Sequence, residues 1–231
     1  MRLPFRRGLA CAAAAAAVLG ASAAPAQAHS PASTVQHQQC QCPKPPQLTL
    51  MRTAHEYAQQ LRGMHGAELE TTFLASMIGH HQMAIDMAKM EIHNGQRPAA
   101  KALARRIITA QRDEIATMRQ WLRDWYGMTP DQALAQSPAA DIIATMSAQM
   151  QDEMMESMML AAPGAQTDLA FLQLMIHHHR MAVMEAAAAM PGTTHSRLAR
   201  LERQIIRSQR HEIRLMRTWI CAWFGHRGAA T

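Results

Sequence analysis

Apolar residues recur at three- and four-residue intervals from Leu48 to the end of the chain, which is the spacing of amphipathic helices. Gly, Pro and Asn interrupt this pattern, and we predict a helix between each pair of interruptions. The expected helices cover about 68–93 and 99–126, start again at a Thr129–Gln132 capping box and at Ser137, and end near Gly164, Gly192 and Gly225. No stretch alternates as a strand does, so the sequence predicts an all-α protein.

One stretch of the predicted helices occurs twice. The segment that begins at Phe73 begins again 98 residues later at Phe171, and the match continues without a gap to Gly127 in the first copy. Roughly two positions in five are identical, which is far above chance for a register fixed over this length. The chain is therefore an internal duplication, with a first helical repeat unit over 48–128 and a second over 129–231.

Each repeat reads as a helical hairpin that is too thin to bury its own apolar stripe, so we expect one antiparallel four-helix bundle with extra flanking helices. At about 100° per residue, His81 lies on the inward stripe of the first motif helix, and Glu114 and Met118 lie on that of its partner. The second copy repeats this arrangement with His179, Glu212 and Met216. A buried His–Glu pair that fixes helix register and an imidazole metal ligand held by a carboxylate both remain open.

A second strip of side chains runs along the edge of the inward stripe. It consists of His80, Met83 and Met87 in the first copy and of His178 and Met181 in the second. Imidazole and thioether together form the donor set that suits Cu(I), whereas hard ions such as Mg²⁺ need oxygen ligands. The dinuclear iron pattern, a Glu-x-x-His on each of two helices, does not occur at the motif. The strip therefore favours a soft metal.

Methionine is the compositional outlier, with 20 residues against 4 Trp, 4 Phe and 2 Tyr. In the densest segment, between the copies, one helix face carries Met146, Met150, Met154 and Met158 at steps of four, and Met155 and Met159 form a neighbouring row. A methionine row is core packing in most proteins, since Met fills gaps well. Acids and amides interleave this row, so we predict an exposed accessory surface that loads soft metal through Met154, Met155, Met158 and Met159.

The first 28 residues have the pattern of a cleaved export signal: arginines, a short apolar run, and Ala26-Gln27-Ala28 at the cleavage position. Residues 29–47 are rich in Pro, Gln and Ser and are predicted to be a disordered tail. No later stretch reaches about 18 uninterrupted apolar residues, so we predict no membrane span. The sequence therefore indicates a periplasmic protein.

The net charge and the cysteine content limit the kinds of partner that the protein can bind. Removing the signal takes away three arginines and no acid, which leaves a formal net charge of +3 in place of +6. Such a mild excess is a solvated helix face, and we expect no nucleic-acid partner. The mature chain keeps an odd number of cysteines, Cys40, Cys42 and Cys221. A disulfide from the tail to Cys221 and a soft-metal site in the tail are both open.

The motif acid-x-x-Phe-Leu-x-x-Met-Ile-x-His-His-x-x-Ala, followed by Gln-x-x-Glu-Ile-x-x-Met-x-x-Trp, resembles the domain of unknown function 305 family. It starts at Glu70 and again at Asp168. The resemblance implies a ferritin-like helical bundle, export, and copper binding of the kind found in periplasmic copper-tolerance proteins. The second copy differs from the first at Glu185 and His177, where the first has Met and Gly.

Three classes of function remain. A binding module would sequester Cu(I), and Ag(I) with its similar thioether preference, or hand it to another copper-handling protein, and so serve copper homeostasis. A metal-independent structural bundle would use the inward His and Glu only for packing. A metal oxidase usually needs a thiolate copper centre or several clustered His ligands. Only the tail cysteines could contribute to such a centre here, so we predict no enzymatic activity. The sequence favours the binding module, with copper as its cofactor.

Overall fold

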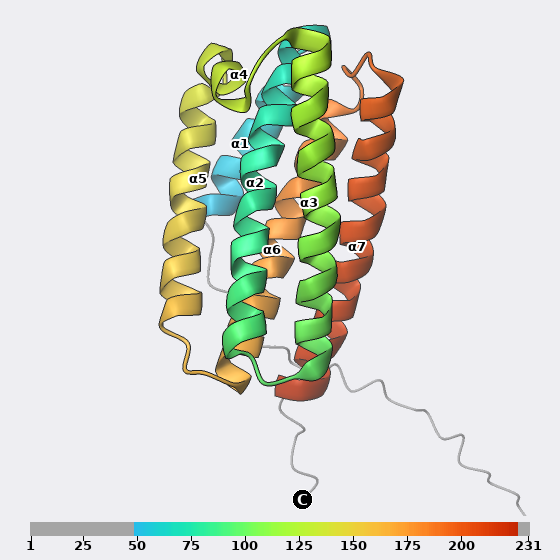
Figure 1. The fold of residues 1–231 in the computed structure, drawn as a ribbon. Helices are drawn as coiled ribbons and strands as arrows, with labels where there is room; N and C mark the ends of the chain where they lie inside the picture. Colours follow the sequence, from blue (N-terminus) through green and yellow to red (C-terminus); the bar gives the residue numbers. More distant parts are fainter. Residues whose placement is uncertain (1–48, 226–231) are drawn as a thin grey trace, which may run out of the picture. The chain divides into compact units, whose positions relative to one another are not determined.

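The computed structural model describes residues 49–225. These residues form seven α-helices and one π-helical turn, η1 (Figure 1). In chain order the elements are α1 Thr49–Gly63, α2 Gly66–Asn94, α3 Pro98–Tyr126, α4 Pro130–Gln136, α5 Ala140–Met154, η1 Met155–Met159, α6 Ala165–Ala189 and α7 Ser196–Phe224. Between residues 49 and 225 there is no strand, only an isolated bridge between Gly95 and Gly164. The prediction of an all-α fold is confirmed.

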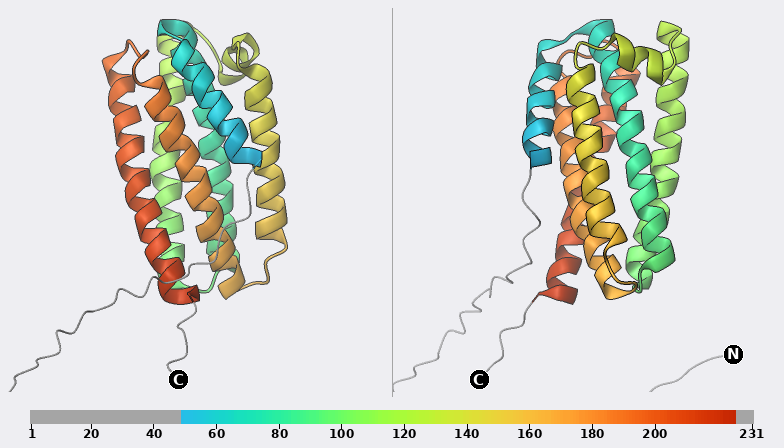
Figure 2. Two further views of the ribbon diagram at one scale, coloured as in Figure 1. Left: turned by 180° about the vertical axis from the view of Figure 1, so that it is seen from behind. Right: turned by 90° about the vertical axis from the view of Figure 1, so that its left-hand side faces the viewer.

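The long helices lie in three layers of two (Figures 1 and 2). Helices α2 and α6 run antiparallel in the middle layer, α3 and α7 cover one side of it, and α1 and α5 cover the other. The two hairpins, α2–α3 and α6–α7, form the expected four-helix bundle. Helix α1 packs mainly on α6, whereas α5 packs on α2 and on α1. Each repeat thus covers the motif helix of the other.

Two buried acids, one near the start of each motif helix, join the repeats. Glu70 of α2 accepts hydrogen bonds from the backbone N–H of His195 (2.8 Å) and of the residue before it (2.5 Å). Asp168 of α6 accepts from the backbone N–H of Arg97 (3.1 Å) and of the residue before it (3.0 Å). His195 and Arg97 are the N-cap residues of α7 and α3, and neither makes a cap with its own side chain. Each repeat therefore caps the last helix of the other. We call these two arrangements the reciprocal caps.

Most helix boundaries follow the signals in the sequence. The capping box at the start of α4 forms as expected, with Thr129 and Gln132 each bonded to the other's backbone N–H. The helix expected to begin at Ser137 begins at Ala140, because the Ser137 hydroxyl first accepts the N–H of residue 139 in a turn. The same helix changes from α to π geometry at Met155 before it ends.

Several predictions fall outside residues 49–225. These are the export signal over 1–28, the tail over 29–47, and the state of Cys40 and Cys42. Cys221, on α7, is disulfide-bonded. No helix in the described part of the chain combines the length and apolar character that crossing a bilayer requires.

Candidate metal centre

The two His-His dipeptides meet where α2 contacts α6. The rings of His80 and His178 lie 3.6 Å apart between centroids, and each has the next histidine of its own helix at 6.2 or 6.1 Å. All four side chains are buried. Consecutive helix residues are rotated by about 100°. The first histidine of each pair therefore faces the opposite middle helix, and the second contacts the layer formed by α3 and α7.

The second histidines form the predicted pairs with the outer helices. The Nε2 atom of His81 lies 2.7 Å from Oε2 of Glu114 on α3, and Nε2 of His179 lies 2.6 Å from Oε2 of Glu212 on α7. Gln204 of α7 also donates to Glu114 at 3.3 Å. Each of these two imidazoles keeps an Nδ1 atom without a hydrogen-bond partner among the described residues. The pairs thus hold the rings in a fixed orientation, which suits both a register-fixing pair and a carboxylate-oriented ligand.

The first histidines have a different environment. His178 uses Nε2 to donate to the backbone carbonyl of His80 at 2.8 Å. Because that bond places the proton on Nε2, Nδ1 of a neutral His178 carries a bare lone pair, and it has no hydrogen-bond partner among residues 49–225. Burial lowers the pKa of both His80 and His178 well below the usual value, and neighbouring histidines add to the shift. Both rings are therefore neutral at pH 7, the state in which imidazole binds metal.

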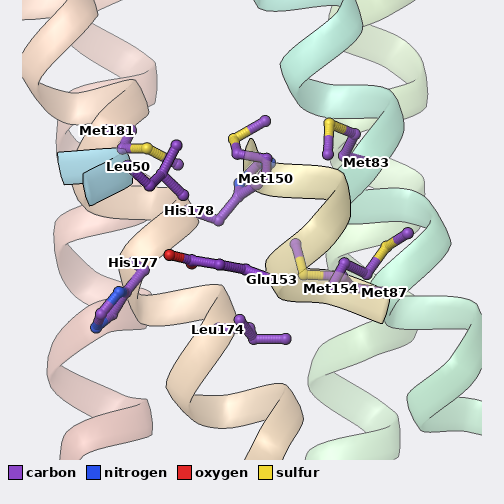
Figure 3. A pocket seen from close by; sticks show the side chains of 10 residues that line it. All are labelled: Leu50, Met83, Met87, Met150, Glu153, Met154, Leu174, His177, His178 and Met181. Carbon is purple, nitrogen blue, oxygen red and sulfur yellow. The ribbon is translucent and has the colours of Figure 1, made fainter. Parts of the chain in front are cut away.

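A cavity of about 20 Å³ lies beside His178, between α2, α5 and α6 (Figure 3). It has room for about one water-sized sphere. Besides His178, its lining includes five methionines and four further side chains: Met83 and Met87 of α2, Met150 and Met154 of α5, Met181 of α6, and Leu50, Glu153, Leu174 and His177. Donors from both repeats and from the Met-rich helix thus meet at one place. We call this space the thioether cavity.

The donor set of the cavity is soft. The described residues contain no group of three or more His, Cys, Asp or Glu side chains that could hold a metal ion. The cavity is instead lined by thioethers, which are neutral, polarisable donors that favour Cu(I) over Mg²⁺ or Zn²⁺. The five thioethers and two imidazoles of the lining therefore fit a monovalent soft cation.

The structure corrects one prediction about the Met-rich segment. The row with four-residue spacing was expected on an exposed side of its helix, but Met146, Met150 and Met158 are buried and Met154 is partly buried. This row faces inward because α5 packs on α1 and α2. Met155 and Met159 do reach solvent, with 48% and 59% of their surface exposed. The segment therefore has an inner row, of which Met150 and Met154 line the cavity, and two outer methionines.

Two candidate ligands lie away from the cavity, and two residues outside the candidate set line it. Met118 and Met216 are fully buried in the two hydrophobic clusters of the core, and neither lines the cavity. Glu153 and His177 line the cavity although neither stood among the candidate ligands. His177 follows from the extra histidine of the second motif, whereas nothing in the sequence places Glu153 beside it.

Comparisons with known proteins agree with the fold. The sequence pattern of a domain of unknown function, DUF305, matches residues 16–122 and 96–220. CopM in the Cu(II)-bound form is 32% identical, with a TM-score of 0.55, and the match covers 67% of this chain and 97% of CopM. CopM in the Ag-bound form obtained by soaking is 31% identical, with a TM-score of 0.55 over 70% of this chain and 100% of CopM.

A DUF305 protein from Streptomyces coelicolor, provisionally described as secreted, is 28% identical. Its TM-score is 0.54, and the match covers 65% of this chain and 90% of that protein. Comparison with curated proteins finds no match.

Proposed function

The chain belongs to the DUF305 family, and we propose that it is an exported copper-binding protein that holds Cu(I) or Ag(I) in the thioether cavity. The protein sequesters the ion or hands it to another copper-handling protein, and thereby contributes to copper tolerance. One observation carries this proposal: five methionines and the buried, neutral His178, whose Nδ1 has no hydrogen-bond partner among residues 49–225, line a space of about one water-sized sphere. The N-terminal signal pattern supports export to the periplasm.

The relatives support a copper-handling role. CopM has been captured with Cu(II) and with Ag. Silver(I) prefers the same soft donors as Cu(I), so a silver-binding relative agrees with a site made mainly of thioether sulfur. The preference for Cu(I) itself rests on the donor chemistry of this chain.

The two repeats act as one binding unit in this proposal. Each supplies part of the cavity, Met83 and Met87 from the first and Met181 and His178 from the second. The pairs of His81 and His179 with their glutamates hold the middle helices at the correct rotation, so that the neighbouring histidines face each other. The exposed Met155 and Met159 are accessory donors at the surface.

The proposal is tested by competition for Cu(I) with a chromophoric chelator under anaerobic reducing conditions, with Zn(II) competition in parallel. We expect the mature protein to withdraw Cu(I) from the chelator and to bind Zn(II) more weakly. A variant with Met83, Met87, Met150 and Met154 all changed to Leu should lose at least about a hundredfold in Cu(I) affinity, close to 3 kcal/mol. Leu conserves the volume, so the fold should persist.

The matched control carries Met118→Leu and Met216→Leu, the same chemical change at buried positions away from the cavity. It should bind Cu(I) like the wild type. Equal loss of affinity in both variants would show that the thioether cavity is not the Cu(I) site. A wild-type protein that takes no Cu(I) would favour the alternative of a metal-independent structural bundle, and Cu(I) would then leave its melting temperature unchanged, because only a ligand of the native state raises it.

A further inference from the structure

A larger hollow lies on the outside of the thioether cavity. Its volume is about 520 Å³, and residues of η1, α6 and the loop between them line it. Glu153, Leu174 and His177 line both this hollow and the cavity. These three side chains therefore form a partition between the two spaces. We call the larger space the outer hollow.

Two of the three partition residues, Glu153 and His177, are polar. Among the described residues that line the outer hollow, Glu153 is the only acid and no Lys or Arg is present. In Figure 3 the carboxylate end of Glu153 points toward the segment of α6 that carries His177. His177 is 3% exposed, and its Nε2 has no hydrogen-bond partner among residues 49–225. A buried imidazole nitrogen left unpaired costs free energy unless it serves a ligand.

The local backbone is also unusual here. Helix α5 widens into the π-turn η1 immediately after Met154, which lines the cavity. Single π-turns within helices are rare and occur frequently at functional sites. Two exposed soft donors, Met155 and Met159, belong to the same turn. This end of the Met-rich segment thus carries thioethers at the surface and thioethers that line the cavity. Glu153 and, from α6, His177 lie at the partition.

We infer that Glu153 and His177 are the entrance through which the metal ion reaches the thioether cavity, an inference that rests on the proposed function. The carboxylate attracts the monovalent cation into the outer hollow, and the unpaired nitrogen of His177 binds it transiently. The ion then exchanges to the sulfurs of Met154 and Met87, which line the cavity with both entrance residues. Because the two residues line both spaces, the ion passes them on its way in and out, and they govern the rates of loading and release.

The test measures loading rates of the full mature chain. The cationic acetonitrile complex of Cu(I) is mixed anaerobically with protein, and unbound Cu(I) is trapped at increasing delays with a chromophoric chelator. Glu153→Gln should slow loading by about tenfold, the lower end of the effect of electrostatic steering. His177→Gln should slow it by a similar factor, because the transient imidazole ligand is lost. The wild-type rate should fall with added salt, and the Glu153→Gln rate should lose most of that dependence. Equilibrium affinity should stay within about twofold, since loading and release slow together.

Asp141→Asn is the matched control, because Asp141 is an exposed acid at the far end of α5 that lines neither space. It should load at the wild-type rate. Wild-type loading rates in the Glu153 and His177 variants, or slow loading in the Asp141 variant as well, would overturn the entrance. A large loss of equilibrium affinity would overturn it too, because the two residues would then be ligands of the final site. Failure of the wild type to bind Cu(I) at equilibrium would instead refute the proposed function. Melting curves of the apo variants verify that each one folds.

Discussion

The His-His dipeptides of α2 and α6 make different contacts on the two faces of this central helix pair. Toward α3 and α7, His81 and His179 are bound to carboxylates at hydrogen-bond distance. Toward the opposite middle helix, the rings of His80 and His178 are tilted against each other, His178 donates to the His80 carbonyl, and His178 also lines the thioether cavity. We call the carboxylate-bound face the paired face and the other the unpaired face, and the two faces differ in whether a carboxylate holds the imidazole.

Breaking the paired face should give the largest effect. Glu114→Ala leaves the buried His81 without its carboxylate, and removal of one partner of a buried pair costs about 3–5 kcal/mol. We expect the free energy of unfolding of the apo protein to fall by that amount in urea denaturation. Cu(I) affinity, measured on the folded fraction, should change little. An unchanged apo stability with a large loss of affinity would instead place His81 and Glu114 in the metal site.

The unpaired face should show the opposite behaviour. His178→Gln keeps a side-chain N–H that reaches toward the His80 carbonyl but removes the Nδ1 lone pair. The unfolding free energy should change by less than about 1.5 kcal/mol, whereas Cu(I) affinity should fall at least about tenfold.

His179→Gln is the control for this prediction, because the same change at the paired position should reduce stability and spare affinity. If His178→Gln and His179→Gln behave alike, the distinction between the two faces is wrong.

A smaller, pH-dependent effect should separate two buried acids at the two ends of the bundle. Although burial alone would raise it, hydrogen bonds from Tyr126, His195 and the adjacent backbone lower the pKa of Glu70 to about 2. Burial, a side-chain hydrogen bond with Asp168 and the negative charge of Asp168 raise the pKa of Glu91 to about 8. Folded Glu91 therefore keeps a proton that the unfolded chain releases above its ordinary pKa of 4.5.

Stability contributed by protonated Glu91 is thus present at low pH and is lost as the pH rises from about 4.5 to about 8. Glu91→Gln should abolish this loss, so it should stabilise the protein at pH 8 and have little effect at pH 4.5. Glu70→Gln should destabilise at both pH values, because the Glu70 carboxylate is ionised down to about pH 2. Denaturation series across this pH range measure both variants, and equal pH slopes for wild type and Glu91→Gln would contradict the assignment.

The sequence predicts the helices and the inward pairs well because both follow from local spacing. The repeat fixes the rotation of each motif helix, so the contact of His81 with Glu114, and of His179 with Glu212, could be derived from the apolar stripe. The position of the thioether cavity could not be derived in this way. It depends on α5 packing over α2 and α1, and that contact between repeats has no periodic signature in the chain. For the same reason the inner methionine row was expected at the surface.

Glu70 and Asp168 illustrate the same limit. Both stand at fixed positions of the repeated motif, and a single helix offers them no partner that the sequence reveals. Only the arrangement of the two hairpins shows that they bind backbone N–H groups of the opposite repeat. Pairing of distant segments is decided by the whole bundle, so motif spacing identifies such residues without assigning their role.

The reciprocal caps also constrain how the chain can fold. The bond from His195 to Glu70 closes a separation of 125 residues, and that from Arg97 to Asp168 closes one of 71. Contacts so distant in sequence form late, since the loop-closure entropy must be overcome before they contribute. The α2–α3 hairpin alone would leave the first turn of α3 uncapped until the second hairpin has been synthesised and docked. Docking of the two hairpins thus forms both reciprocal caps and also brings together the residues of both repeats that line the thioether cavity.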